Sequence, residues 1–258
     1  MTPSTTSPEF RGKKPLKIAL PLAVWLGAWQ LAALVVDSPL LLPGPAAVAV
    51  RLAALAGTGG FWLTALASLG RIFAGFAVGA AAGTLGAALA AAWPAADWIL
   101  SPAVKVVRAT PVASFIVLVL LWAPTGRVPA IIAGLMVLPV LWGNVRKGID
   151  QTDPKLLEAA GMYRFSRWKL LGLVYLPSVL PYFASGCSTA LGLAWKAGVA
   201  AEVLCQPRLA IGARLYGAKI TLETDALFAW TLVVIVLSFL VEYALGFLLR
   251  RLGRGEKT

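Results

Sequence analysis

The chain has 258 residues, of which 59% are hydrophobic and only 13% are charged, and its apolar runs are too long for the elements of an ordinary soluble core. This length holds several membrane spans with their loops and excludes a large additional soluble domain. The formal net charge of +12 does not indicate nucleic acid, because Lys and Arg gather at the ends of apolar runs and in one central loop. We expect a single all-α domain in the lipid bilayer.

Two residue types restrict the chemistry further. Histidine is absent, which removes the commonest metal ligand, general base and proton-relay side chain. Cys187 lies inside an apolar run and Cys205 just beyond its end, so neither a disulfide framework nor a metal cluster is indicated. The sequence therefore predicts no metal site and no cofactor bound by this chain.

The N-terminal part of the chain predicts a tail, a first span and an external segment. Residues 1–17 are polar and basic, and the apolar run at 18–36 is long for a signal-peptide core and lacks a convincing cleavage site. The positive-inside rule places the tail in the cytoplasm. Prolines and a glycine break the helix after the run, so we assign 18–60 to the first span and an external segment.

A second span is predicted from about Leu69 to Ala92. It carries a GxxxGxxxG pattern formed by Gly75, Gly79 and Gly83. Small residues at this spacing let another helix approach closely. We interpret this face as a helix-packing surface, either within the subunit or across a dimer.

A third span is predicted after a tight turn at 93–97. It is expected to reach about Trp122, despite Lys105, Arg108 and Pro111 near its start. The two cations lie about one turn apart on a helix, so their side chains can extend to the cytoplasmic surface.

Three further spans are predicted at 128–145, 179–201 and 226–249. Residues 202–225 are expected to form a polar external loop with a short helix. Basic residues after the last span place the C-terminal tail, 251–258, in the cytoplasm. The sequence thus predicts six spans with both termini in the cytoplasm.

The segment between the fourth and fifth spans, 146–177, is charged and helix-prone. Asp153, followed by a proline, is a good N-cap for a short helix. Ser166 can cap a second helix, which Pro177 and Pro181 would bend into the next span. The first helix is expected to present an apolar face of Leu156, Leu157, Ala160 and Tyr163.

The residue spacing in this segment resembles a known motif. The pattern consists of Glu158, Ala159 and Ala160 and, starting sixteen residues after the glutamate, Val174, Leu176 and Pro177. It is similar to the cytoplasmic EAA loop of bacterial ABC importer permeases, which are multi-pass proteins of the inner membrane. The resemblance implies the six-helix type I permease fold, with a permease core domain at 61–250. It also implies that the loop is a coupling helix seated in a groove of the ATPase subunit.

One position of the implied coupling loop departs from the family pattern. Where the family commonly has a glycine six residues after the glutamate, this chain has Arg164. We therefore expect the turn between the two short helices to differ, and Arg164 to be free to contact the ATPase. The full set implied by the resemblance is Asp153, Leu156, Leu157, Glu158, Ala159, Ala160, Gly161, Arg164, Leu176 and Pro177.

Four other stretches look like the nitrate, sulfonate and taurine branch of these permeases. They are LLPGPAAVAVRL, SLGRIFAGF, RATPVASFIVLVLLWAPTGR and GVAAEVL. These matches label a branch and not a solute, because selection in such systems lies largely with the external binding protein. Nitrate, an organosulfonate and a vitamin precursor all remain compatible.

Charged residues inside the spans are candidates for a translocation path. Lys196 lies within the fifth span, where an ionisable group costs a few kcal/mol unless it is paired or hydrated. Lys196 and Glu202 are therefore candidate path residues. The alternative is that Lys196 extends to the surface and Glu202 marks the outer end of the span. Arg71 is interpreted as an interfacial anchor.

The leading hypothesis is the membrane-spanning subunit of an ABC importer. No GxxxxGK[ST] phosphate loop occurs, so ATP and Mg are expected on a separate ATPase subunit and no residue of this chain is expected to be catalytic. By resemblance, ATPase subunits dock at the cytoplasmic face and an external binding protein delivers the solute. Two copies of the chain are expected to form the path, with a paralogous partner left open.

Two other classes of protein fit less well. An ion-gradient-driven secondary transporter usually carries carboxylates or histidines near the membrane centre, but here Glu242 is the main acid of the last span. An intramembrane enzyme would need a zinc motif or an activated nucleophile, and the sequence has no HExxH motif and no convincing nucleophile with a base.

Overall fold

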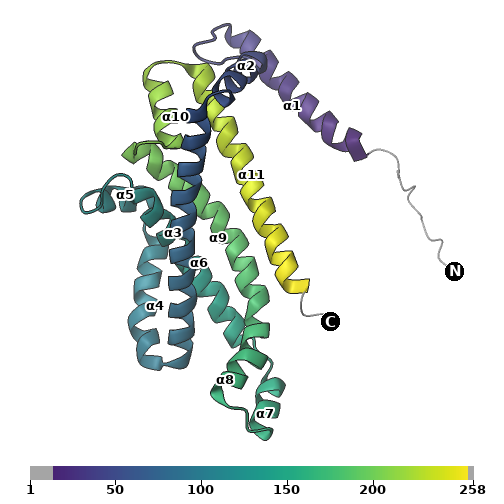
Figure 1. Ribbon diagram of the computed structural model, residues 1–258, viewed down its shortest axis with the longest axis vertical. Helices are drawn as coiled ribbons and strands as arrows, with labels where there is room; N and C mark the ends of the chain where they lie inside the picture. The colour runs from purple at the N-terminus through teal and green to yellow at the C-terminus, as the bar shows by residue number, and fades with distance from the viewer. Residues whose placement is uncertain (1–13, 255–258) are drawn as a thin grey trace, which may run out of the picture.

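The computed structural model describes residues 14–254, and over this range the chain consists of helices joined by short turns (Figure 1). The expectation of an all-α fold is therefore confirmed. The elements are α1 (Lys14–Val36), α2 (Pro45–Ala56), α3 (Gly59–Ala92), α4 (Pro94–Ala109), α5 (Val112–Leu120), α6 (Val128–Asp150), α7 (Pro154–Met162), α8 (Arg167–Leu170), the π-helical turn η1 (Leu171–Tyr175), α9 (Leu176–Cys205), α10 (Ile211–Ile220) and α11 (Thr224–Arg254).

Five described helical stretches are long and apolar enough to cross a membrane, and a bent pair of shorter helices makes a sixth candidate. The multi-pass expectation is confirmed, but the boundaries differ. Helix α3 begins ten residues before Leu69, at Gly59, and has 34 residues. At about 1.5 Å per residue it is longer than the ~30 Å hydrocarbon layer, so its ends extend beyond the layer.

The predicted third span is broken in two. Helices α4 and α5 are separate and bend by 104° at the break between them. Pro111 lacks an amide hydrogen and disfavours the helical conformation of the residue before it, and Thr110 accordingly has an extended ψ of 131°.

Two other prolines do not break their helix. Pro177 and Pro181 were expected to bend the second short helix into the next span, and α8, η1 and α9 join there as one stretch, Arg167–Cys205. In the π-helical turn the Leu176 N–H donates to the Leu171 carbonyl, five residues back. Pro177, the next residue, has no N–H to donate, and the wider turn before it accommodates the proline in the helix.

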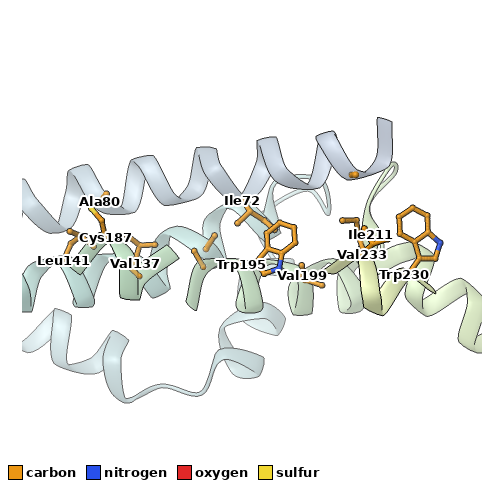
Figure 2. Packing of buried hydrophobic residues seen from close by; sticks show 14 of the residues in the cluster. Ile72, Ala80, Val137, Leu141, Cys187, Trp195, Val199, Ile211, Trp230 and Val233 are labelled. Carbon is orange, nitrogen blue, oxygen red and sulfur yellow. The ribbon is translucent and has the colours of Figure 1, made fainter. Parts of the chain in front are cut away.

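The core lies between α3, α6 and α9, with α10 and α11 completing it at one end (Figure 2). Figure 2 shows Ile72 of α3 beside Trp195 of α9, whose indole N–H donates to the Val234 carbonyl at 3.1 Å. Helices α3 and α6 approach closely along the glycine face. A Cβ at Gly75, Gly79 or Gly83 would lie 2.0, 2.4 or 2.5 Å from a carbonyl oxygen of α6.

Helix α1 stands apart from these long helices (Figure 1), and its most apolar window has no buried residues. Its contacts concentrate at the C-terminal part. The Trp29 ring stacks on Phe228 with centroids 5.7 Å apart, and its indole N–H donates to the Pro43 carbonyl at 3.1 Å. One end of α1 is therefore fixed near the start of α11, while the rest offers its apolar surface to lipid.

Candidate functional site

Helix α7 begins where two local signals coincide. The carboxylate of Asp153 accepts a hydrogen bond from the Lys155 N–H at 2.9 Å, and Pro154 occupies the first helical position. The cap satisfies an amide that the first turn leaves unpaired, and proline removes another. Ser166 acts in the same way for α8, accepting from the Lys169 N–H at 3.4 Å. Both predicted caps are confirmed.

The turn between α7 and α8 contains a left-handed residue, Arg164, with φ 50°. Its N–H donates to the Gly161 carbonyl at 3.0 Å, and the Phe165 N–H donates to the Ala160 carbonyl at 2.9 Å. This pair of bonds is the Schellman arrangement, which favours glycine at the left-handed position. The backbone thus follows the path that a glycine would favour, and an exposed arginine side chain extends from it.

An Arg164→Gly variant is expected to stabilise this turn. The left-handed conformation costs an L-residue about 1 kcal/mol, so removing this cost should slow hydrogen exchange of the turn amides by about fivefold at most. Glycine also raises the conformational entropy of the open state, which makes the slowing smaller than this limit. Mass-spectrometric hydrogen exchange of a peptide covering 158–166 measures this. Lys169→Gly, which removes the same charge from α8, should speed local exchange; faster exchange in both variants would contradict the left-handed assignment.

The surface of α7 and α8 carries exposed apolar side chains. Those of Leu156, Met162, Tyr163 and Trp168 are 49%, 86%, 79% and 84% exposed. Of the expected apolar face, only Ala160 is buried and Leu157 half-buried, while Glu158 is exposed beside them. This chain therefore covers the face only in part. Large exposed apolar side chains on two consecutive short helices are typical of an interaction surface.

An ion pair joins the C-terminal end of α6 to α4. This end of α6 leads into the α7–α8 segment. Arg146 Nη1 lies 3.2 Å from Asp97 Oδ1, and Arg146 Nε lies 3.4 Å from Asp150 Oδ1. Ser101 Oγ also donates to Asp97, at 2.7 Å. Such partly exposed pairs add little stability, but they fix the relative positions of the two helix ends. Sequence analysis missed this contact because its partners lie 49 residues apart.

The two candidate path residues lie in different surroundings. Lys196 is exposed on α9, on a face that also exposes Ser185, Thr189 and Leu193. Glu202, six residues further along the same helix, is fully buried. In this conformation only the lysine is open to a path.

Glu202 is held by contacts from two other helices. Its carboxylate accepts hydrogen bonds from Ser68 Oγ at 2.8 Å, Arg71 Nη2 at 3.0 Å and the Gly212 N–H at 3.1 Å. The Ile211 N–H donates to Ser68 Oγ at 2.9 Å. The N-cap residue of α10 supplies no side-chain acceptor, so Glu202 and Ser68 satisfy the first amides of that helix instead. The network fixes α10 against α3 and α9.

Arg71, interpreted from the sequence as an interfacial anchor, makes specific contacts within the protein. Its side chain is only 20% exposed and pairs with Glu202. It also donates to the carbonyl oxygens of Arg208 at 3.1 Å and Leu209 at 2.6 Å. No sequence signal identified this pairing, because Arg71 and Glu202 are 131 residues apart and meet only when α9 packs on α3.

The acidic and thiol side chains that the structure describes do not form a metal-binding cluster. In the part of the chain that the structure describes, no three Asp, Glu or Cys side chains lie close enough to hold an ion. The buried carboxylate of Glu202 instead serves an ion pair and a helix cap.

Residues 75–254 match the family model described as "Binding-protein-dependent transport system inner membrane component". The chain is 31% identical to the taurine transport system permease protein TauC of Escherichia coli (strain K12), over 91% of this chain and 86% of that protein. It is 27% identical to the putative aliphatic sulfonates transport permease protein SsuC of Bacillus subtilis (strain 168), over 96% and 92%. It is 30% identical to the riboflavin transport system permease protein RibX of Chloroflexus aurantiacus, over 92% and 88%.

The fold is similar to the solved "Crystal structure of an amino acid ABC transporter with histidines", with a TM-score of 0.56, 17% identity, and coverage of 72% of this chain and 89% of that chain. At this identity the likeness shows the fold alone. The family consists of multi-pass permease subunits of the bacterial cytoplasmic membrane, which transport and do not catalyse, and the ATPase is a separate subunit. The chain therefore belongs to the binding-protein-dependent transport system inner membrane components, the permease subunits of ABC transporters.

Proposed function

We propose that this chain forms the translocation path of an ABC importer for a small anion of the nitrate, sulfonate or taurine type. ATPase subunits, which bind ATP and Mg, dock at the end that carries α7 and α8, and an external binding protein delivers the solute to the other end. Two copies of the chain enclose the path, and both termini lie in the cytoplasm. The observation that carries the proposal is the α7–α8 segment, which extends beyond the long helices with exposed apolar side chains around Glu158 (Figure 1).

The backbone of this segment suits the transmission of force. Helix α7 is closed by a cap at one end and a Schellman turn at the other, so it can move as a unit. The second helix continues without a break from Arg167 to Cys205. A displacement of α8 by the ATPase would therefore pass directly into α9, which carries Lys196.

The solute class is supported by the names of relatives and by charge. Two of the relatives transport taurine or aliphatic sulfonates according to their names, while a third is named for riboflavin. Lys196 is exposed on α9 and is our proposed path residue within the spans. A cation that faces a path favours an anion over a neutral solute. A vitamin precursor is the alternative solute.

The experiment is ATP hydrolysis by the reconstituted complex. The chain, co-expressed with candidate ATPase and binding-protein subunits, is placed in proteoliposomes and tested with nitrate, taurine, methanesulfonate and a riboflavin precursor. We expect one of the anions to stimulate hydrolysis severalfold in the presence of the binding protein. Uptake that follows an imposed ion gradient and needs no ATPase subunit would refute the importer and indicate a secondary transporter.

A further inference from the structure

A cavity of about 770 Å³ lies at the break between α4 and α5. Its walls are the last turn of α4, the first turn of α5, the stretch of α6 from Met136 to Lys147, and Leu193 of α9. Its charged lining residues are Arg108 and Lys147, and both side chains are exposed. A volume of this order suits a small solute together with water.

Arg108 lies deep along α4. It follows Asp97 by eleven residues, which corresponds to about 16 Å along a helix. Asp97 pairs with Arg146, which lies in the last turns of α6, four residues before the helix ends at Asp150. Taking the hydrocarbon layer of ~30 Å to begin near this level, we infer that Arg108 lies about halfway across it.

Three arginines that join helices of the bundle are paired with acidic residues, and the cations of the cavity are not. Arg51, Arg71 and Arg146 each lie against a carboxylate. Among the residues that the structure describes, no carboxylate pairs with Arg108 or Lys147. A cation at this depth without an acidic partner requires water or an anion beside it.

The backbone at the cavity supports the same conclusion. The break at Thr110 and Pro111 interrupts the helix at membrane depth, where irregular backbone is tolerated only inside protein or beside a water-filled space. The first turn of α5 faces the cavity through Pro111 and Val112. The first amides of a helix carry a partial positive charge, which adds to that of Arg108; of those in α5, the Ser114 N–H donates to the Pro111 carbonyl at 3.1 Å.

We propose that this cavity is an anion site on the translocation path, in which Arg108 contacts the oxyanion group of a small sulfonate-type solute. Guanidinium binds two oxygens of such a group at once, which gives orientation as well as attraction. Lys147 lies at the end of the cavity toward α7, and Lys196 lies one turn beyond Leu193 on the exposed face of α9. The three cations define the order Lys196, Arg108, Lys147 along the path. The inference rests on the proposed importer function.

The test measures binding of methanesulfonate to the purified full-length chain. The midpoint of thermal unfolding is measured at increasing concentrations of sodium methanesulfonate. A parallel series with sodium chloride at the same ionic strength serves as the reference. We expect a saturable rise in the wild-type chain. Arg108→Gln should weaken the apparent affinity about tenfold or more, because it removes a charged hydrogen-bonding partner. Arg108→Lys should lie between the two, and Lys196→Gln should weaken binding less.

Lys105→Gln is the matched control, because Lys105 is exposed one turn earlier on α4 and outside the cavity lining. It should bind methanesulfonate as the wild-type chain does. Equal affinity in the wild type, Arg108→Gln and Arg108→Lys would overturn the site, as would equal losses in Arg108→Gln and Lys105→Gln. A low unfolding midpoint of Arg108→Gln without anion would indicate misfolding, and the decision then rests on Arg108→Lys against Lys105→Gln.

Solute-stimulated ATP hydrolysis by the full complex separates the two proposals. If hydrolysis is stimulated in the wild type but Arg108→Gln binds methanesulfonate normally, the cavity assignment fails and the importer stands. If Arg108→Gln loses binding but no solute stimulates wild-type hydrolysis, the importer fails and the anion site stands.

Discussion

A Glu158→Lys variant is expected to lose solute-stimulated ATP hydrolysis while the chain remains inserted and folded. Glu158 is exposed on α7 and lies among the side chains that we propose to enter a groove on the ATPase. Reversing a charge at such a contact places like charges together, which costs several kcal/mol at an interface. Stimulation should therefore fall by more than about tenfold.

The measurement compares hydrolysis by the reconstituted complex with co-purification of the ATPase subunit. Because Glu158 makes no ion pair with a described residue, the unfolding midpoint of the isolated chain should not change. Glu158→Gln, which keeps the shape and removes only the charge, should lose less than the lysine variant. Full stimulation in Glu158→Lys, with the ATPase still bound, would refute the coupling assignment.

Local signals in the sequence predicted the two helices of the α7–α8 segment well. Asp153 and Ser166 cap their helices as expected, because a cap depends on residues two or three positions away. The left-handed turn at Arg164 was not predicted in detail. Its backbone is set by the hydrogen bonds that close α7, and these overrode the preference of the arginine.

The positions of the prolines did not predict where the membrane-spanning helices are interrupted. Pro102, Pro139 and Pro181 lie inside helices, whereas Pro111 separates α4 from α5. Neighbouring helices can compensate a missing amide in a membrane, so a proline alone does not decide between a kink and a break. The cavity at Pro111 depends on α6 and α9, which no local pattern specifies.

Contacts between residues far apart in the sequence also could not be predicted. The sequence identified Glu202 as a charged residue at the end of a span, but its partners Ser68 and Arg71 come from α3, more than a hundred residues earlier. Burial of this carboxylate became favourable only when three helices met. A candidate path residue and a structural ion pair therefore looked alike in sequence, and only the packing distinguishes Lys196 from Glu202.

The glycine face of α3 leads to a second large effect, because Gly75→Ala is expected to destabilise the bundle strongly. The added Cβ would lie 2.0 Å from the Ala130 carbonyl oxygen and 2.8 Å from its carbon, and backbone atoms cannot move aside as a side chain can. The two helices must separate, which weakens the packing of α6 and, through it, of α9. Overpacking of this kind costs about 1–3 kcal/mol or more.

Gly70→Ala on the same helix is the matched control, because a Cβ there would meet no atom within 4 Å. Alanine favours the helix by about 1 kcal/mol relative to glycine, so this variant should be neutral or slightly stabilised. The unfolding midpoint of the purified chain should fall by about 3–10 °C in Gly75→Ala relative to Gly70→Ala. Equal midpoints would mean that α3 and α6 are further apart than the structure places them. A loss in both variants would instead mean that Gly70 is itself covered, and the exposed end of α3 would then be a contact with a second copy of the chain.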